Sequence, residues 1–320
     1  MKKEKVYQAL QKANNLLKEK GYNVFAVILQ GSQNYGLDIY SEDYTSDVDC
    51  KAFVFPSFED VYSGNKVSKV YKVGCKETGL EQVEVKDIRL FSELLSKVNP
   101  SYIELLATDY VLTPYKEEFN KLKSFLPKLL ETRGMLFANS VYGMAMEKEK
   151  ALCHPYPATL DKIEKFGYDP KQLHHIIRLY YLLDGFHKGE GLNLMVEGER
   201  KEYLISVKRG SYTLAAALET SKVYTMLLRQ LKESYVNSVP TSEVVRELDE
   251  FIRSLVMGSI QRQLGFAAEG SSMQGYKAPF LSLPPAVRQF VKEQHPEIEA
   301  KHMVEVLEVK RYELINFWEK

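Results

Sequence analysis

The stretch VILQGSQNYGLDIYSEDYTSDVDCKAFVF, residues 27–55, decides the fold of the N-terminal part of the chain. Its first apolar run belongs to NVFAVILQ (23–30), a continuous, β-branched and aromatic segment that predicts a buried strand. Its second run, in DVDCKAFVF (47–55), predicts another strand, which Pro56 ends. The polar loop between them opens on Gly31-Ser32 and closes on Asp47-Val48-Asp49. This loop is either an acidic turn between strands or a place where metal ions hold a nucleotide.

The sequence around this stretch predicts an α/β (α+β) core followed by a large, mostly helical domain. Residues 3–20 show helical spacing of apolar positions, and segments 66–73 and 81–88 alternate like a strand pair. Strand signals then fade, and we expect a small mixed sheet in a core domain of residues 1–114 and a helical domain of residues 115–320. Further predictions are a hairpin or irregular segment at 193–213, a loop at 265–285 and a last helix at 297–320.

Composition narrows the classes of function. The 320 residues are 45% hydrophobic and 27% charged, as in a globular protein, and 43 basic residues balance 43 acidic ones. Zero net charge argues against a clamp on long duplex DNA, which usually has a basic excess. Three widely spaced cysteines indicate neither a disulfide framework nor a zinc site. No long apolar run is present, so we expect no signal peptide, no membrane partner and a cytoplasmic location; the oligomeric state is not indicated.

Two carboxylates, Asp47 and Asp49, lie on one face of the second predicted strand because strand side chains alternate. Lys51 shares that face, so a plain salt bridge is one interpretation. The other is a Mg²⁺ site, since this hard cation prefers oxygen ligands and keeps waters and phosphates as further ligands. Glu84, between Val83 and Val85, is either a third ligand on a neighbouring strand or a solvent-facing charge.

The turn that precedes these carboxylates has residues suited to phosphate. At Gly31 the backbone can approach a phosphate closely, and the hydroxyl of Ser32 can bond a phosphate oxygen. Tyr35 either stacks on a base or pins the loop to the core.

A predicted helix in the second half of the chain, within GYDPKQLHHIIRLYYLLDGF (167–186), has a cationic face. Asp169 is its expected cap and Pro170 its first residue. Lys171, His175 and Arg178 recur at i, i+4 and i+7, opposite the apolar face. These three are either solvated surface or a clamp for a triphosphate. A small basic and aromatic cluster from Lys208 to Tyr212 is either an exposed turn or a contact for nucleic acid.

The motifs GSQNYG and SDVDCK resemble the signature of the DNA polymerase beta-type nucleotidyltransferase superfamily, in which Gly-Ser is followed by a DxD pair. The segment GYDPKQLHHIIR extends the resemblance to the RNA-ligase-associated branch of predicted nucleotidyltransferases. The loop between Ser32 and Asp47 is longer here than in that branch, by the acidic segment DIYSEDYT (38–45).

The resemblance implies a metal-dependent enzyme that moves an NMP from an NTP to an acceptor hydroxyl, with an RNA end as one candidate acceptor. It implies Mg²⁺ or Mn²⁺ at Asp47, Asp49 and Glu84. The nucleotide would contact the turn at Gly31, Ser32 and Tyr35, and the basic residues Lys51, Lys171, His175 and Arg178. Two alternatives stay open: a nucleotide-binding protein without catalysis, and an enzyme that adds a nucleotide to a partner protein, as in toxin–antitoxin pairs.

Overall fold

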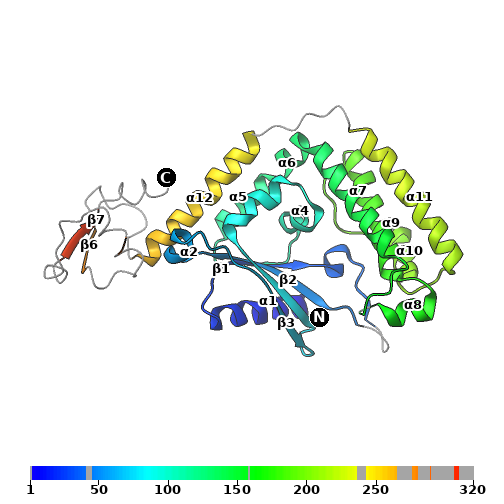
Figure 1. The fold of residues 1–320 in the computed structure, drawn as a ribbon, viewed down its shortest axis with the longest axis horizontal. Helices are drawn as coiled ribbons and strands as arrows, with labels where there is room; N and C mark the ends of the chain where they lie inside the picture. Colours follow the sequence, from blue (N-terminus) through cyan, green and yellow to red (C-terminus); the bar gives the residue numbers. More distant parts are fainter. Residues whose placement is uncertain are drawn as a thin grey trace.

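A mixed β-sheet with helices on both faces forms the centre of the molecule (Figure 1). The computed structural model describes residues 2–40, 45–157, 159–235, 243–264, 276–279, 289 and 306–309. The strands are β1 (Asn23–Gln30), β2 (Val48–Phe55), β3 (Ser68–Cys75), β4 (Leu80–Asp87), β5 (Val111–Leu112), β6 (Tyr276–Pro279) and β7 (Val306–Val309). The 3₁₀ turns are η1 (Ser32–Tyr35) and η2 (Ile88–Leu90). The helices are α1 (Lys2–Glu19), α2 (Phe58–Tyr62), α3 (Phe91–Ser96), α4 (Pro100–Ala107), α5 (Lys116–Ser124), α6 (Leu126–Thr132), α7 (Gly134–Ala151), α8 (Leu160–Phe166), α9 (Pro170–His187), α10 (Gly198–Lys208), α11 (Leu214–Glu233) and α12 (Glu243–Gln263).

The sheet has the strand order β3-β4-β2-β1-β5 among the described residues. Strands β2 and β4 run parallel, and the other neighbouring pairs are antiparallel, so the predicted mixed sheet is confirmed. The register places Gln30 of β1 opposite Asp49 of β2. It also places Lys51 of β2 opposite Glu84 of β4. Asp47 itself lies just before β2, which begins at Val48.

Each face of the sheet has its own apolar layer. Helix α1 covers one face, where its buried Leu10 and Leu17 belong to the same cluster as Val27 of β1. The spacing of the apolar side chains along α1 produces a single buried stripe, as the sequence predicts. The opposite face, which carries Phe25 and Phe53, packs against the helices that follow the sheet in sequence. Asp49 and Lys51 alternate with the residues that face α1, so they lie on this second face.

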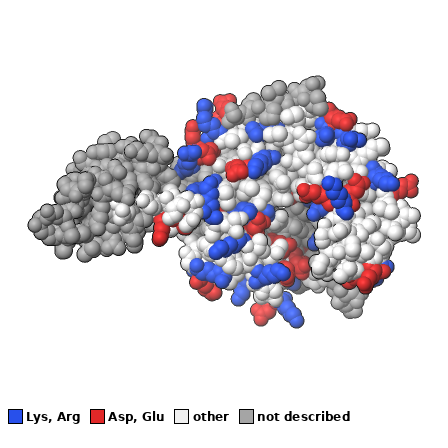
Figure 2. Space-filling view, in the orientation of Figure 1, with Lys and Arg blue, Asp and Glu red and all other residues white. Residues whose placement is uncertain are grey.

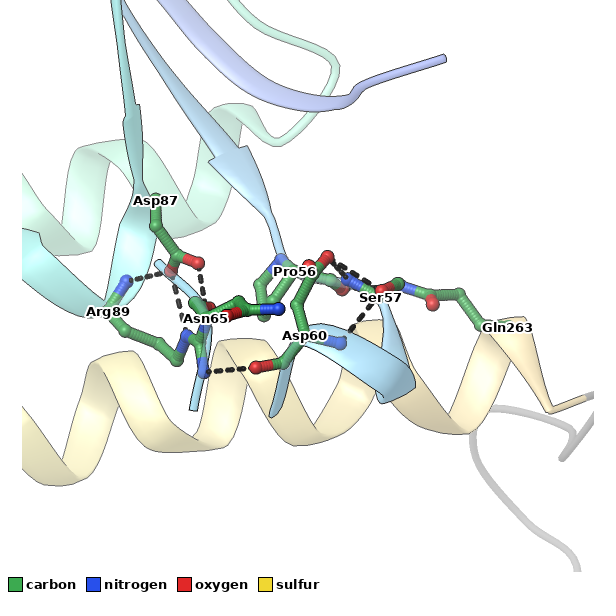
Figure 3. A network of polar contacts seen from close by, with 7 residues as sticks. All are labelled: Pro56, Ser57, Asp60, Asn65, Asp87, Arg89 and Gln263. Atoms are coloured by element: carbon green, nitrogen blue, oxygen red, sulfur yellow. Dashed lines mark hydrogen bonds and ion pairs between the residues drawn. The ribbon is translucent and has the colours of Figure 1, made fainter. Parts of the chain in front are cut away.

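Helix α12 returns from the C-terminal part of the chain to the sheet. Gln263 near its end donates from Nε2 to the carbonyl oxygen of Pro56, at 2.9 Å (Figure 3). At the other end of the network drawn in Figure 3, Arg89 donates to Asp87 from Nε at 2.9 Å and from Nη2 at 2.6 Å, and also to the carbonyl oxygen of Asp60. One apolar cluster runs from Phe25 to Leu264. The helices therefore share a core with the sheet, and the domain division after residue 114 stays a prediction.

Local signals in the sequence explain most of these elements. Asn99 caps α4 by accepting from the amide of Ser101. Asp169 caps α9 by accepting from the amide of Lys171, as predicted. The hairpin or irregular segment predicted at 193–213 is wrong over 198–208, where helix α10 lies, while residues 193–197 and 209–213 are irregular. Ile205 and Val207 alternate with polar residues, which gives this short helix the pattern of a strand.

The predictions for the C-terminal stretch lie mostly outside the described residues. Strands β6 and β7 pair antiparallel. They fall within the loop predicted at 265–285 and the helix predicted at 297–320, so both predictions are wrong at those positions. The remaining residues of the two segments are outside the described part. No described helix combines the length and apolar character that crossing a membrane requires.

Candidate functional site

A tight turn follows the central strand β1 and forms the first part of the site. Gly31 has φ of 102° and ψ of −157°, a backbone conformation that side-chain-bearing residues rarely adopt. The amide of Asn34 donates to the carbonyl oxygen of Gly31 at 3.1 Å, and the amide of Leu37 donates to that of Ser32 at 3.0 Å. The backbone conformation at position 31 therefore explains why a glycine is found there.

Buried side chains hold this turn in place from three directions. Gln33 donates from Nε2 to the carbonyl oxygen of Asp47 at 2.7 Å, which ties the turn to the start of β2. Asn34 donates to the carbonyl oxygen of Leu29 at 2.9 Å and accepts from Thr108 at 2.6 Å. The hydroxyl of Tyr35 donates to Glu104 of α4. Because these partners lie on different elements, they fix the position of the turn.

The two carboxylates of the DxD pair meet this turn, as the sequence predicts. Asp49 is half-buried opposite Gln30, the last residue of β1 before Gly31, and Asp47 is exposed. Burial raises the pKa of Asp49; the charge of Lys171 opposes the rise, and Asp47 and Glu81 add to it. The acidic end of β2 thus carries crowded negative charge beside the turn.

Two lysines from the helical part act on this acidic end. Lys171, exposed in the first turn of α9, is near enough to lower the pKa of Asp49. Lys208, at the end of α10, donates from Nζ to the carbonyl oxygen of Leu37 at 3.1 Å. Burial and the charge of Lys171 lower the pKa of Lys208 to about 8, against the raising effects of Asp38 and Asp47. Cations from α9 and α10 therefore lie close to the carboxylates at the start of β2.

The acidic loop between the turn and β2 is closed at its base. Ser46 is buried; its amide donates to the carbonyl oxygen of Ile39 at 2.8 Å, and its Oγ accepts from the amide of Ile39 at 2.9 Å. An antiparallel bridge joins Tyr40 to Thr45. The two ends of this loop are therefore held together at Ile39–Tyr40 and Thr45–Ser46, and residues 41–44 lie outside the described part.

Glu84, the predicted third carboxylate, lies beside lysines. Its Oε2 pairs with Nζ of Lys51 at 2.9 Å and its Oε1 pairs with Nζ of Lys86 at 3.0 Å. Burial alone would raise the pKa of Glu84, but the hydrogen bonds and charges of the two lysines bring it below its ordinary value. Lys51 is buried under the ring of Tyr102, with Nζ 4.0 Å from the ring centroid. The charged groups of Lys51 and Glu84 are therefore engaged with each other.

The cationic face predicted for α9 is only partly present. Lys171 is exposed, but the Arg178 side chain is 7% exposed and pairs with Glu104 through Nη1 and Oε1 at 2.9 Å. The guanidinium carbon of Arg178 lies 3.9 Å from the centroid of the Tyr35 ring. Burial, with the charges of His174, Arg178 and Lys171, lowers the pKa of His175 well below its ordinary value. Of the two alternatives for this face, solvated surface does not hold for Arg178, because this residue and Tyr35 form a buried cluster with Glu104.

Oxygen ligands for a divalent cation are available only in part. Among the described residues, no group of three or more His, Cys, Asp or Glu side chains is arranged to hold a metal ion. Asp47 and Asp49 offer carboxylate oxygens. Gln33 adds Oε1, a buried acceptor with no partner among the described residues, 4.0 Å from the position a Cβ on Gly31 would take. This donor set fits Mg²⁺ or Mn²⁺ that takes its other ligands from water and phosphate.

Sequence reasoning missed the role of Gln33 and the placement of Lys208. Nothing in the residue type of Gln33 marks it, since its importance lies in one hydrogen bond to the backbone of Asp47. The position of Lys208 at the end of a helix was not predicted, because its segment has the alternation of a strand. Over the face seen in Figure 2, basic and acidic side chains of the described residues are interspersed.

Comparisons with known proteins add little to this geometry. No family model and no curated protein matches the chain. One solved structure with detectable similarity is a nucleotidyltransferase-like protein from Exiguobacterium sibiricum 255-15. The alignment covers 81% of this chain and 92% of that chain, at 14% sequence identity and a TM-score of 0.29. A similarity at that TM-score carries no argument about the fold or the function of this chain.

Proposed function

We propose that the chain is a nucleotidyltransferase, which binds an NTP with Mg²⁺ or Mn²⁺ between the Gly31–Ser32 turn and the acidic end of β2. It transfers the NMP to an acceptor hydroxyl, with an RNA end as the first candidate acceptor. One observation carries the proposal: Gln33 fixes the turn against Asp47 at the acidic end of β2. Lys171 of α9 supports it, because its charge acts on the same acidic end. A polyanion with a bound cation complements that mixture of charges.

The residues of the chain have distinct tasks in this proposal. Gly31 lets a phosphate approach the backbone, and Ser32 donates its hydroxyl to a phosphate oxygen. Lys171 and Lys208 neutralise phosphate charge from the helical side. Asp47 and Asp49 would hold the divalent cation, which when bound offsets the charge that develops on the leaving pyrophosphate. In the transfer, the acceptor oxygen bonds to the α-phosphorus and the bond from that phosphorus to pyrophosphate breaks.

The test measures binding and transfer separately. Calorimetry with each of the four NTPs and Mg²⁺ gives affinity, and α-labelled NTPs with a mixed pool of RNA and protein reveal the acceptor. The variant Asp47→Asn with Asp49→Asn is expected to lose metal-dependent NTP binding by at least about tenfold, since two charged ligands are removed. The control Glu117→Gln with Glu118→Gln removes two carboxylates from α5 and should bind as the wild type does. Unchanged binding in the Asp47/Asp49 variant contradicts the proposal.

A second candidate, nucleotide binding without transfer, is favoured by the pairing of Glu84 with Lys51 and Lys86. Because Glu84 is engaged by these lysines, it does not join Asp47 and Asp49 as a third carboxylate ligand. The variant Glu84→Gln separates the candidates. If Glu84 takes part in transfer, labelling falls by about a hundredfold or more while NTP binding persists. If the chain binds the NTP without transferring the NMP, no acceptor carries label with the wild type or with Glu84→Gln. Label on protein instead of RNA identifies a partner protein as the acceptor.

A further inference from the structure

The second face of the sheet, which carries Asp49, is covered unevenly. At β1 and β2 its residues Phe25 and Phe53 are buried in one cluster with side chains of the helices that follow the sheet. At β4 the same face carries half-buried Glu84. At β3, the edge strand of this sheet among the described residues, it carries Val70, which is 57% exposed. The second face is therefore open from β4 to the edge of the sheet.

This open face begins beside the proposed metal site. The register places Gln82 of β4 opposite Asp49, and Lys72 of β3 opposite Gln82. Residues paired in this way point to the same face, and neighbouring strands lie about 4.8 Å apart, so the backbone of Lys72 is about 10 Å from that of Asp49. At about 3.4 Å per nucleotide, a nucleic-acid strand that ends at Asp49 passes Lys72 within about three phosphates.

The proposed NTP lies on the other side of Asp49. The turn with Ser32 follows β1, which flanks β2 on the side away from β4. Lys208 of α10 donates to the carbonyl oxygen of Leu37 just after this turn, and a cavity of about 350 Å³ lies further into the helical part, between α9 and the segment that leads into α10. In nucleotidyl transfer the attacking and leaving oxygens are roughly in line across the phosphorus. With the NTP on the β1 side, we therefore expect the acceptor on the side of β4 and β3.

The open face has an excess of positive charge. Glu84 pairs with Lys51 at 2.9 Å and with Lys86 at 3.0 Å, so one carboxylate lies between two lysines. Lys72 adds a third cation and is exposed. Three lysines against one carboxylate complement a chain of phosphates. Val70, opposite Glu84, offers an exposed apolar contact for a base or a ribose.

We propose that the open face of β4 and β3 binds the single-stranded end of an RNA and directs its terminal hydroxyl to the metal site, with Lys72 as a phosphate contact. This inference rests on the proposed function, because the face leads to the carboxylates of that site. A protein acceptor has no phosphate chain for Lys72, so the contribution of this one charge separates the two kinds of acceptor.

The experiment measures RNA binding by the full chain without NTP. Fluorescence anisotropy uses a labelled single-stranded RNA of about 12 nucleotides with Mg²⁺, a length in the range of single-strand sites. Lys72→Glu is expected to weaken binding by at least about tenfold and to lower the slope of log affinity against log salt by about 0.7 for each lost phosphate contact. The control Lys69→Glu makes the same change of charge on the same strand. Lys69 lies opposite Val85, on the face that α1 covers, so its variant should bind within about twofold of the wild type.

The outcomes separate this inference from the proposed function. Equal losses in the two variants overturn it, as does unchanged binding by Lys72→Glu. A wild type that binds no RNA up to about 100 μM, the weak end of non-specific binding, also overturns it. Calorimetry with NTP and Mg²⁺ on the same proteins tests the nucleotide site by itself. A wild type that binds no NTP contradicts the proposed function, whereas NTP binding without RNA binding contradicts only the acceptor face.

Discussion

The buried ion pair between Arg178 and Glu104 offers the sharpest test of how the helical part is joined to the sheet. Both side chains are 7% exposed, and Nη1 lies 2.9 Å from Oε1. The variant Arg178→Met leaves the carboxylate of Glu104 buried, with the hydroxyl of Tyr35 as its one remaining hydrogen-bond partner among the described residues. Removing one partner of a buried ion pair costs about 3–5 kcal/mol, so we expect a loss of that size in the free energy of unfolding.

A surface pair of nearly the same length provides the control. Lys97 and Glu93 lie 2.8 Å apart, with side chains 62% and 60% exposed. Lys97→Met should cost less than about 1 kcal/mol, since water screens an exposed pair. The two pairs differ in burial and hardly in distance, so the difference between the variants measures the effect of burying the charges.

Urea unfolding followed by far-ultraviolet circular dichroism gives both free energies. The double variant Arg178→Met with Glu104→Gln removes the orphaned charge and keeps an oxygen that accepts from Tyr35. It is expected to recover roughly half of the loss, because the desolvated charge is the main cost. Equal losses for Arg178→Met and Lys97→Met would refute the reasoning, as would a double variant no more stable than Arg178→Met.

Two further predictions concern the turn and its surroundings. Because burial and Lys171 lower the pKa of Lys208 to about 8, the unfolded chain holds a proton that the folded chain lacks between that pH and the ordinary pKa of 10.5, and the stability contributed by this residue rises with pH there. Lys208→Met should therefore flatten the rise in urea stability between about pH 7.5 and about pH 9.5, and an identical pH dependence in variant and wild type speaks against the burial of this amine. Gly31→Ala should cost about 1–3 kcal/mol in urea unfolding because of its backbone conformation. By contrast, Gly143→Ala, in α7 with nothing within 4 Å of the new Cβ, should stabilise by about 0.5–1 kcal/mol; equal effects would contradict the assigned strain.

Local patterns in the sequence were sufficient for much of the sheet. The run 23–30 and the segment 47–55 are strands within one residue of the prediction, because each has a length and an apolar content that only a buried strand satisfies. The cap at Asp169 could be predicted because capping depends on residues adjacent in the chain. Gly31 and the acidic pair lie at the same end of the sheet because β1 and β2 are antiparallel neighbours.

The partners of the charged residues could not be predicted, because they depend on distant elements. Helical spacing placed Arg178 opposite the apolar face of α9, which is correct for an isolated helix. In the fold, Glu104 of α4 lies against that position and draws the guanidinium into the core. Likewise the alternation around Glu84 fixed its face of the sheet, but the parallel register with β2 decides that its neighbour is Lys51 and not a carboxylate.

The wall between the turn and the cavity is only one peptide segment thick. The amide of Val196, which lines the cavity, donates to the carbonyl oxygen of Tyr35 in η1 at 3.0 Å. Met195 packs where Gly36 has no side chain, since a Cβ there would be 2.7 Å from its Sδ. A molecule that immobilises residues 195 and 196 therefore also restricts the backbone that presents Ser32. Thermodynamic linkage is reciprocal, so an effector in the cavity that changes NTP affinity by a given factor must have its own affinity changed by the NTP by that same factor.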